Sequence, residues 1–254
     1  MNKIEIAVLN PDAVKNAEKM TAFCARLTQR GHKIKDMTDL KTLYEKDCSE
    51  GLLTALTKLP HPTIQKFGVI NVAVVGASRR FLAQITRHQN EVKFMSASLQ
   101  YSDYSDEGDF VVPYDLLAMG GADVYLDACR AAMREYKIAV EAGIDHDAAG
   151  YIAPQGLRNI LIISATPYQW KHMISQRSCR RNTKETAYVM LKIWEELYKL
   201  SPLLFDPATT GPGCMKGKCL EGKMCCGKAI NKNYTPDRIL AEDFPLLVKE
   251  EALV

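Results

Sequence analysis

The stretch Gln84-Ile85-Thr86-Arg87-His88-Gln89, followed by Ser98-Leu99-Gln100-Tyr101-Ser102, is the most informative part of this sequence. It gathers amide, guanidinium, imidazole and hydroxyl groups just after a strongly apolar run. Ser78 suits the N-cap of a helix through residue 87, which would bring Gln84, Arg87 and His88 together at its last turn. These groups predict a site for a phosphate or carboxylate. On composition alone, a solvated helix end with favourable dipole contacts is the simpler interpretation.

A second polar cluster runs from Arg177 to Glu185 and holds three arginines and one lysine. It lies between two predicted helices, so it fits an anion site and a solvated basic turn equally well. Cys179 lies among these cations, which favour a thiolate, but no neighbouring histidine is available in the sequence to act as its base.

The bulk composition is that of an ordinary soluble protein. The chain has 254 residues, of which 47% are hydrophobic and 25% charged. The formal charge of +3 is too small to indicate nucleic-acid binding. The longest apolar runs, such as Val72–Val75 and Ile160–Ile163, are too short to span a bilayer. The first residues lack the pattern of a signal peptide, so we expect a cytoplasmic protein with no nucleic-acid or membrane partner.

Hydrophobic periodicity predicts an alternation of helices and strands. A Thr-Pro pair at 166–167 is a typical helix start. The order of elements predicts one α+β domain over residues 1–205, with a Cys-, Gly- and Lys-rich C-terminal extension over 206–254. We expect strands at 3–8, 67–76 and 109–112, helices at 11–30, 39–59 (one or a pair), 78–87, 122–143, 168–178 and 183–200, a loop over most of 90–107, and a strand or helix at 157–165.

The segment Val72–Arg79 resembles a strand that enters the phosphate loop of a dinucleotide-binding fold. That loop needs further glycines so that the backbone can approach the pyrophosphate. Bulky residues, from Arg79 to Leu82, stand there instead. We therefore expect Gly76 to be a turn residue and not part of such a loop.

The eight cysteines divide into two groups. Four are scattered and are expected to be free thiols in a reducing compartment: Cys24, Cys48, Cys129 and Cys179. The other four are clustered and could bind zinc or an iron–sulfur cluster: Cys214, Cys219, Cys225 and Cys226. Their spacing lacks any C-x2-C pair, which favours a compact loop, with or without a labile disulfide, over a metal site.

Taken in order, the motifs resemble those of the flavin-dependent thymidylate synthases. In that family an Arg-His-Arg triplet precedes a Ser-x-Arg-Tyr element, and a His-x-Ser/Thr element precedes the central strand. The resemblance covers residues 1–228 and includes a C-terminal tail found in part of the family. The matching elements are Ala25-Arg26-Leu27, His61-Pro62-Thr63, Gln84-x-x-Arg87-His88, Ser98-x-x-Tyr101-Ser102, Arg177–Glu185 and Ser201–Phe205.

The resemblance implies a mixed or antiparallel sheet with flanking helices, and a homotetramer that binds FAD and nucleotide where subunits meet. It implies reductive methylation of dUMP to dTMP, with methylenetetrahydrofolate and NADPH as co-substrates, and no attacking cysteine. By position, His61 and Ser98 would be catalytic. The flavin would contact Thr63, Arg87, His88, Gln89 and His172, and the nucleotide would contact Gln84, Ser98, Gln100 and Arg177.

Several positions depart from the family pattern. Gln89 and Gln100 stand where the family has arginine, Gly150 aligns with another arginine, and Lys66 replaces an acid. Each lost charge-assisted hydrogen bond to a phosphate is worth about 1.5–3 kcal/mol. Compensation would have to come from Lys93, Arg180 or Arg181. The alternatives are therefore the same chemistry on another pyrimidine nucleotide, or a non-catalytic nucleotide-binding relative.

Overall fold

The computed structural model describes residues 4–217, 219 and 221–251 and is built on a four-stranded antiparallel sheet. Its strands lie in the order β1-β2-β4-β3. The predicted α+β class with a central antiparallel sheet and flanking helices is therefore confirmed. The strands are β1 (Glu5–Val8), β2 (Ile70–Ser78), β3 (Val92–Ser96) and β4 (Arg158–Ala165).

The two central strands, β2 and β4, have side chains that alternate between a buried and an open face. Val72 pairs with Ile163 and Val74 with Leu161, and all four side chains are at most 2% exposed. Alternate residues of a strand point to opposite faces, so these four form one apolar layer. This layer is the centre of the main hydrophobic core.

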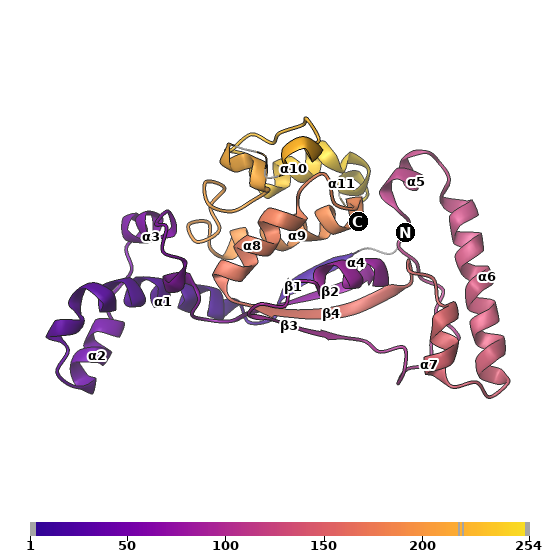
Figure 1. Cartoon of the computed structure of the whole chain (residues 1–254), viewed down its shortest axis with the longest axis horizontal. Helices are drawn as coiled ribbons and strands as arrows, with labels where there is room; N and C mark the ends of the chain where they lie inside the picture. Colours follow the sequence, from indigo (N-terminus) through magenta and orange to yellow (C-terminus); the bar gives the residue numbers. More distant parts are fainter. Residues whose placement is uncertain (1–3, 218, 220, 252–254) are drawn as a thin grey trace.

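Helices cover this buried face of the sheet (Figure 1). They are α4 (Arg79–Ile85), α8 (Pro167–Arg177) and α9 (Lys184–Leu200). Thr166 caps α8 as the sequence indicates, and Thr183 caps α9. Trp170 and Trp194 are fully buried, and their indole N–H groups donate to the carbonyls of Ile70 (3.1 Å) and Phe205 (2.9 Å). These bonds satisfy the polar edge of each buried ring.

Two helical arms extend from opposite ends of the sheet (Figure 1). The arm formed by residues 114–152 has a core of its own around Tyr136 and Leu157. The first arm comprises α1 (Pro11–Arg30), the 3-10 helix η1 (Gly31–Lys33), α2 (Met37–Tyr44), α3 (Glu50–Thr57) and η2 (Pro62–Gln65). The second comprises α5 (Tyr114–Ala118), α6 (Ala122–Glu141), α7 (His146–Ala149) and η3 (Gly150–Ile152).

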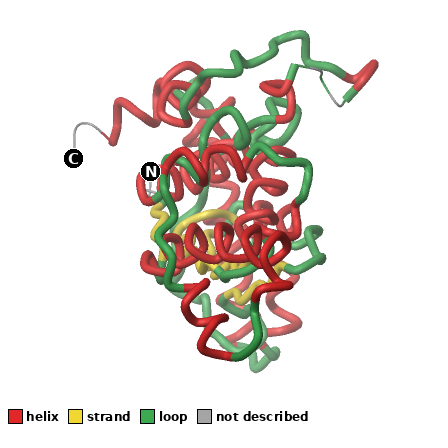
Figure 2. Tube along the Cα trace, turned by 90° about the vertical axis from the view of Figure 1, so that its left-hand side faces the viewer, coloured by secondary structure: helices red, strands yellow, loops and turns green. Residues whose placement is uncertain are grey.

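The C-terminal segment folds back over the helices, so that it lies above the strands in Figure 2. Its elements are η4 (Gly213–Lys216), η5 (Gly222–Met224), α10 (Pro236–Asp243) and α11 (Pro245–Glu251). Ile239, Leu240 and Phe244 are at most 2% exposed and belong to the same core as the sheet. The extension is thus anchored by apolar contacts of α10.

The structure differs from the sequence-based elements, or decides between alternatives, in several places. Residues 92–96, expected in a loop, form β3, whereas the strand expected at 109–112 is reduced to a single bridge between Phe110 and Leu157. The ambiguous run at 157–165 is β4. The helix expected through residue 87 ends at Ile85. Gly76 lies inside β2 at a bulge, with φ of 87°, and is not a turn residue.

The other face of the sheet carries exposed apolar side chains. Met95, Ile160 and Ile162 are 70%, 50% and 38% exposed, so no described helix of this chain covers them. Within the described residues, no helix has both the length and the apolar character needed to cross a membrane.

Candidate functional site

The site begins where β2 runs into α4. Ser78 caps α4 by accepting a hydrogen bond from the backbone N–H of Phe81 (3.1 Å). Phe81 and Ile85 are buried and fix the helix against the core. The backbone N–H of His88 then donates to the carbonyl of Ile85 (3.1 Å). The turn that carries Arg87 and His88 is therefore held by a short, well-anchored helix.

Helix α8 brings two further predicted residues to this turn. Arg177, its last residue, donates from Nε to Nε2 of His88 at 2.8 Å. His172 packs edge-on against His88, with ring centroids 5.8 Å apart and an interplanar angle of 82°. His88 thus contacts both His172, which the resemblance assigned with it to the flavin, and Arg177, which the resemblance assigned to the nucleotide.

These side chains line a pocket of about 840 Å3. Arg87, Gln89 and Arg181 also line it, and Glu221 is the acidic residue among its walls. Among the ion pairs of the described residues, none involves Arg87, Arg177 or Arg181. Unpaired guanidinium groups in a concave site are suited to a phosphate or carboxylate.

Burial keeps the histidines of the pocket neutral. The pKa of His88 falls from 6.5 to about 4, first because of burial and then because of the charge of Arg177, with His172 and Arg87 contributing less. Burial and the charge of Lys216 also lower the pKa of His172. At neutral pH the pocket therefore combines neutral imidazoles with cationic guanidinium groups.

Three of the predicted substrate residues lie elsewhere in the same chain. Gln84 faces α9, where its Oε1 accepts a hydrogen bond from Thr186 Oγ1 (3.3 Å). Ser98 and Gln100 follow β3, and the Ser98 hydroxyl accepts from the backbone N–H of Gln100 (3.1 Å). None of the three lines the pocket around His88. Within one chain, Arg177 is thus the one predicted nucleotide residue that lines this pocket.

His61 and Thr63 also lie outside the pocket around His88. His61 precedes η2 and is exposed, as is Thr63 within it. They lie in the first helical arm, where their neighbours Pro60 and Pro62 line a second pocket that shares His172 with the pocket around His88. Neither member of the predicted catalytic pair, His61 and Ser98, lines the pocket around His88 of its own chain.

Sequence reasoning missed the amide side chains of the pocket. Gln169, Asn90 and Gln176 line it, and the Gln169 side chain donates to the backbone carbonyl of Asn90. A signal was present in the sequence. Gln169, His172 and Gln176 have the i, i+3, i+7 spacing of one helix face. The predicted helix therefore places both glutamines on the same face as His172.

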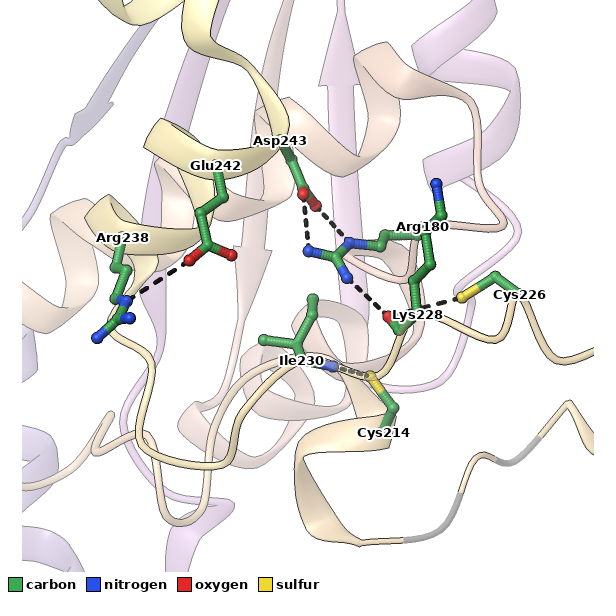
Figure 3. Close-up of polar contacts among 8 residues, drawn as sticks. All are labelled: Arg180, Cys214, Cys226, Lys228, Ile230, Arg238, Glu242 and Asp243. Atoms are coloured by element: carbon green, nitrogen blue, oxygen red, sulfur yellow. Dashed lines mark hydrogen bonds and ion pairs between the residues drawn. The ribbon is translucent and has the colours of Figure 1, made fainter.

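Arg180 does not take part in the site. Its guanidinium makes two hydrogen bonds to Asp243 (2.7 and 2.8 Å), and Nη1 donates to the carbonyl of Lys228 (2.7 Å), as Figure 3 shows. It thereby ties the C-terminal segment to the α8–α9 turn. Of the two arginines expected to compensate for Gln89 and Gln100, only Arg181 lines the pocket.

The clustered cysteines do not form the zinc or iron–sulfur site considered from the sequence. Among the described residues, no group of three or more histidine, cysteine, aspartate or glutamate side chains could hold a metal ion. Two of the sulfur atoms accept from the backbone: Cys214 from Ile230 N–H (3.5 Å) and Cys225 from Gly227 N–H (3.4 Å). The Cys225 side chain also hydrogen-bonds those of Cys219 and Cys226. Cys214 and Cys219 line the pocket, Cys225 and Cys226 are exposed, and all four are free thiols.

Comparison with known proteins agrees with the resemblance. The sequence model of the family described as thymidylate synthase complementing protein matches residues 11–203. The flavin-dependent thymidylate synthase of Geobacter sulfurreducens is 25% identical over 229 residues, covering 89% of this chain and 94% of that protein. The enzyme of the same name from Thermococcus onnurineus is 28% identical over 192 residues, covering 72% and 76%.

Two solved structures have a similar fold. A UMP/dUMP methylase, PolB from Streptomyces cacaoi bound with 5-Br dUMP, has a TM-score of 0.62 at 15% identity over 81% of this chain and 94% of that one. Thymidylate synthase X from Helicobacter pylori with FAD and dUMP has a TM-score of 0.60 at 15% identity over 80% and 98%. With the family match over residues 11–203, these findings establish that the chain is a divergent member of the thymidylate synthase complementing protein family, the flavin-dependent thymidylate synthases.

Proposed function

We propose that this protein methylates dUMP to dTMP in a flavin-dependent reaction that uses methylenetetrahydrofolate and NADPH. The observation that carries the proposal is the contact of Arg177 with His88, itself packed on His172, in a pocket with unpaired arginines. Family membership supplies the reaction type, and the pocket supplies cations and neutral donors for two anionic ligands.

The pocket suits FAD in size and in its donor groups. A volume of about 840 Å3 lies within the range of cofactor sites. We infer that Arg87, His88, Gln89 and His172 hold the flavin; when bound, it supplies the hydride that completes the methyl group. Neutral His88 and His172 provide hydrogen-bonding edges without adding charge beside an uncharged ring system.

Arg177 is the residue that we assign to the nucleotide. Its Nε is engaged by His88, and its other N–H groups are available for the phosphate or the uracil edge. Cys179 also lines the pocket, but burial raises the pKa of its thiol, so it remains protonated at neutral pH. A protonated thiol is a poor nucleophile, which agrees with a reaction that needs no attack by an enzyme cysteine.

We infer that the active enzyme is a homotetramer in which the site is completed by neighbouring subunits. Two observations support this. Ser98 and Gln100 do not line the His88 pocket of their own chain, and the sheet exposes Met95, Ile160 and Ile162. An apolar face of this kind is typical of an interface. Light scattering after gel filtration gives four chains per particle if the inference is right.

An activity assay tests the proposal directly. Purified protein with FAD, NADPH, methylenetetrahydrofolate and dUMP should release dTMP, which chromatography separates from dUMP. The Arg177→Ala variant is the matched control and should lose this product. Absence of product from dUMP, UMP and dCMP alike would instead indicate a non-catalytic nucleotide-binding relative.

A second candidate keeps the chemistry but changes the nucleotide. It is favoured by the glutamines at 89 and 100 and by the commitment of Arg180 to Asp243, which leave fewer cations for the phosphate. The fold similarity to a protein described as a UMP/dUMP methylase is compatible with it. Calorimetric titration with dUMP, UMP and dCMP separates the two candidates, because binding of UMP or dCMP without dUMP supports only the second.

A further inference from the structure

Lys171 is a buried cation for which the proposed reaction has no use. Its residue is 8% exposed, and Nζ donates to Gln65 Oε1 (2.8 Å) and to Thr209 Oγ1 (3.3 Å). Both acceptors are uncharged. No ion pair of the described residues includes Lys171.

The charged groups around Lys171 do not neutralise it. Its pKa is lowered from 10.5 to about 7, first by burial and then by the charge of Lys216, and Asp206 opposes this only partly. His172 on the same helix and Lys58 at the end of α3 line the same pocket and add no negative charge. An ammonium buried without a counter-charge is costly, so an anion at this point would stabilise it.

The space beside Lys171 is large enough for such a ligand. It is a second pocket of about 700 Å3, with Lys216 on its more exposed side. Part of its wall is apolar, formed by Leu59, Pro60, Pro62 and Tyr168. His172, Ser175 and Gln176 line this pocket and the His88 pocket alike, so the two are neighbours that share one face of α8.

We propose that Lys171 and Lys216 form a second anion site, which binds the phosphate or carboxylate of a small molecule whose remaining part lies against the apolar wall. The site does not depend on the nucleotide assignment. It lies beside Arg177 and uses different cations. Its ligand is therefore a compound other than the one held by Arg177, and the two can be bound together.

Anion binding at this site is coupled to proton uptake. The amine of Lys171 is only partly protonated near pH 7, and an adjacent anion favours its charged form. Bound anion should therefore raise the pKa of Lys171, and affinity should weaken as pH rises from 7 to 9. A lysine that only supports the fold through Gln65 and Thr209 would show neither effect.

The test is NMR of the full-length protein with labelled lysine side chains, titrated with inorganic phosphate and separately with glutarate. We expect the Lys171 signal to titrate near pH 7 without anion and at least 1 unit higher with one of them, a shift equivalent to about tenfold tighter binding to the protonated form. A response to phosphate alone identifies a phosphate ester as the ligand class, and a response to glutarate alone identifies a carboxylate.

Four variants make the result specific. Lys171→Met keeps the length of the side chain and should weaken anion binding about tenfold or more, and Lys216→Met tests the site without disturbing a buried position. Arg177→Ala should leave the response of Lys171 intact, while Lys33→Met, at an exposed position, controls for overall charge. An unchanged pKa of Lys171 with both anions, or equal affinity in wild type and Lys216→Met, would overturn the proposal.

Discussion

Arg177 donates from Nε to Nε2 of His88 at 2.8 Å, which joins the end of α8 to the turn that follows α4. Because Nε2 accepts this bond, the proton of the neutral imidazole must lie on Nδ1. Protonation of Nε2 would remove the acceptor and place a second cation beside Arg177. The contact therefore fixes the tautomer of His88, and it fixes the direction in which the guanidinium points.

Replacing His88 should loosen the flavin. His88→Ala removes both the hydrogen-bond acceptor of Arg177 and the ring that packs on His172, so we expect flavin affinity to fall about tenfold or more. His88→Gln retains an acceptor and should lose less. Flavin bound after gel filtration, measured by absorbance, gives the comparison. Full flavin content in His88→Ala would show that this residue does not hold the cofactor.

Stability should decrease in acid because of His88. Its pKa is about 4 in the folded protein, against 6.5 for an unperturbed histidine, so the unfolded chain binds the additional proton between these values. The free energy of unfolding should therefore fall as pH decreases from about 6.5 to about 4, and this term should be constant above that window. Urea unfolding of His88→Gln should show a shallower decrease, whereas equal slopes in the two proteins would rule out this role of His88.

Removing the Arg177 guanidinium should weaken the nucleotide more than the flavin. A charge-assisted hydrogen bond is worth about 1.5–3 kcal/mol, so Arg177→Ala should reduce nucleotide affinity about tenfold or more. Arg177→Lys keeps the charge but not the planar fork, and should recover only part of the loss. Calorimetry on the flavin-loaded protein measures both variants. Unchanged nucleotide affinity in Arg177→Ala would show that other cations bind the phosphate.

The pair of Arg180 and Asp243 should matter for the stability of the C-terminal segment. Their side chains are 19% and 14% exposed and are joined by two hydrogen bonds. Asp243→Asn leaves the arginine without its counter-charge and should cost about 1–3 kcal/mol of unfolding free energy. Asp127→Asn breaks an exposed pair and should change it by about 0.5 kcal/mol or less. Equal losses of unfolding free energy in Asp243→Asn and Asp127→Asn, measured by urea unfolding, would contradict this role of the pair.

The sequence predicted the long elements well because their signals are local. The helix at 11–30 has the predicted bounds, and the cap at Thr166 begins α8 as expected. The strand at 92–96 was missed because Lys93 and Ser96 make it polar, and its structure comes from pairing with β4. The run at 109–112 is apolar but forms only one bridge, so pairing again overrode composition.

The site was predictable only in the part that one chain builds. Arg87, His88, Gln89, His172 and Arg177 come together because α4 and α8 pack on the same core. Arg180 is held away from the pocket by its bond to Asp243, a residue 63 positions away that no local pattern connects with it. Ser98 and Gln100 lie in a segment whose function, on our proposal, requires another subunit, and such a contact leaves no signal in the spacing of residues.

The visible spectrum of the FAD-loaded protein, recorded during titration with dUMP, tests the central claim most directly. We predict a bound flavin whose absorption band shifts as dUMP is added, because Arg177 places the nucleotide next to the ring that His88 and His172 hold. A bound flavin that is indifferent to dUMP but responds to UMP or dCMP would support the second candidate function. A protein that binds no flavin at all would contradict the account.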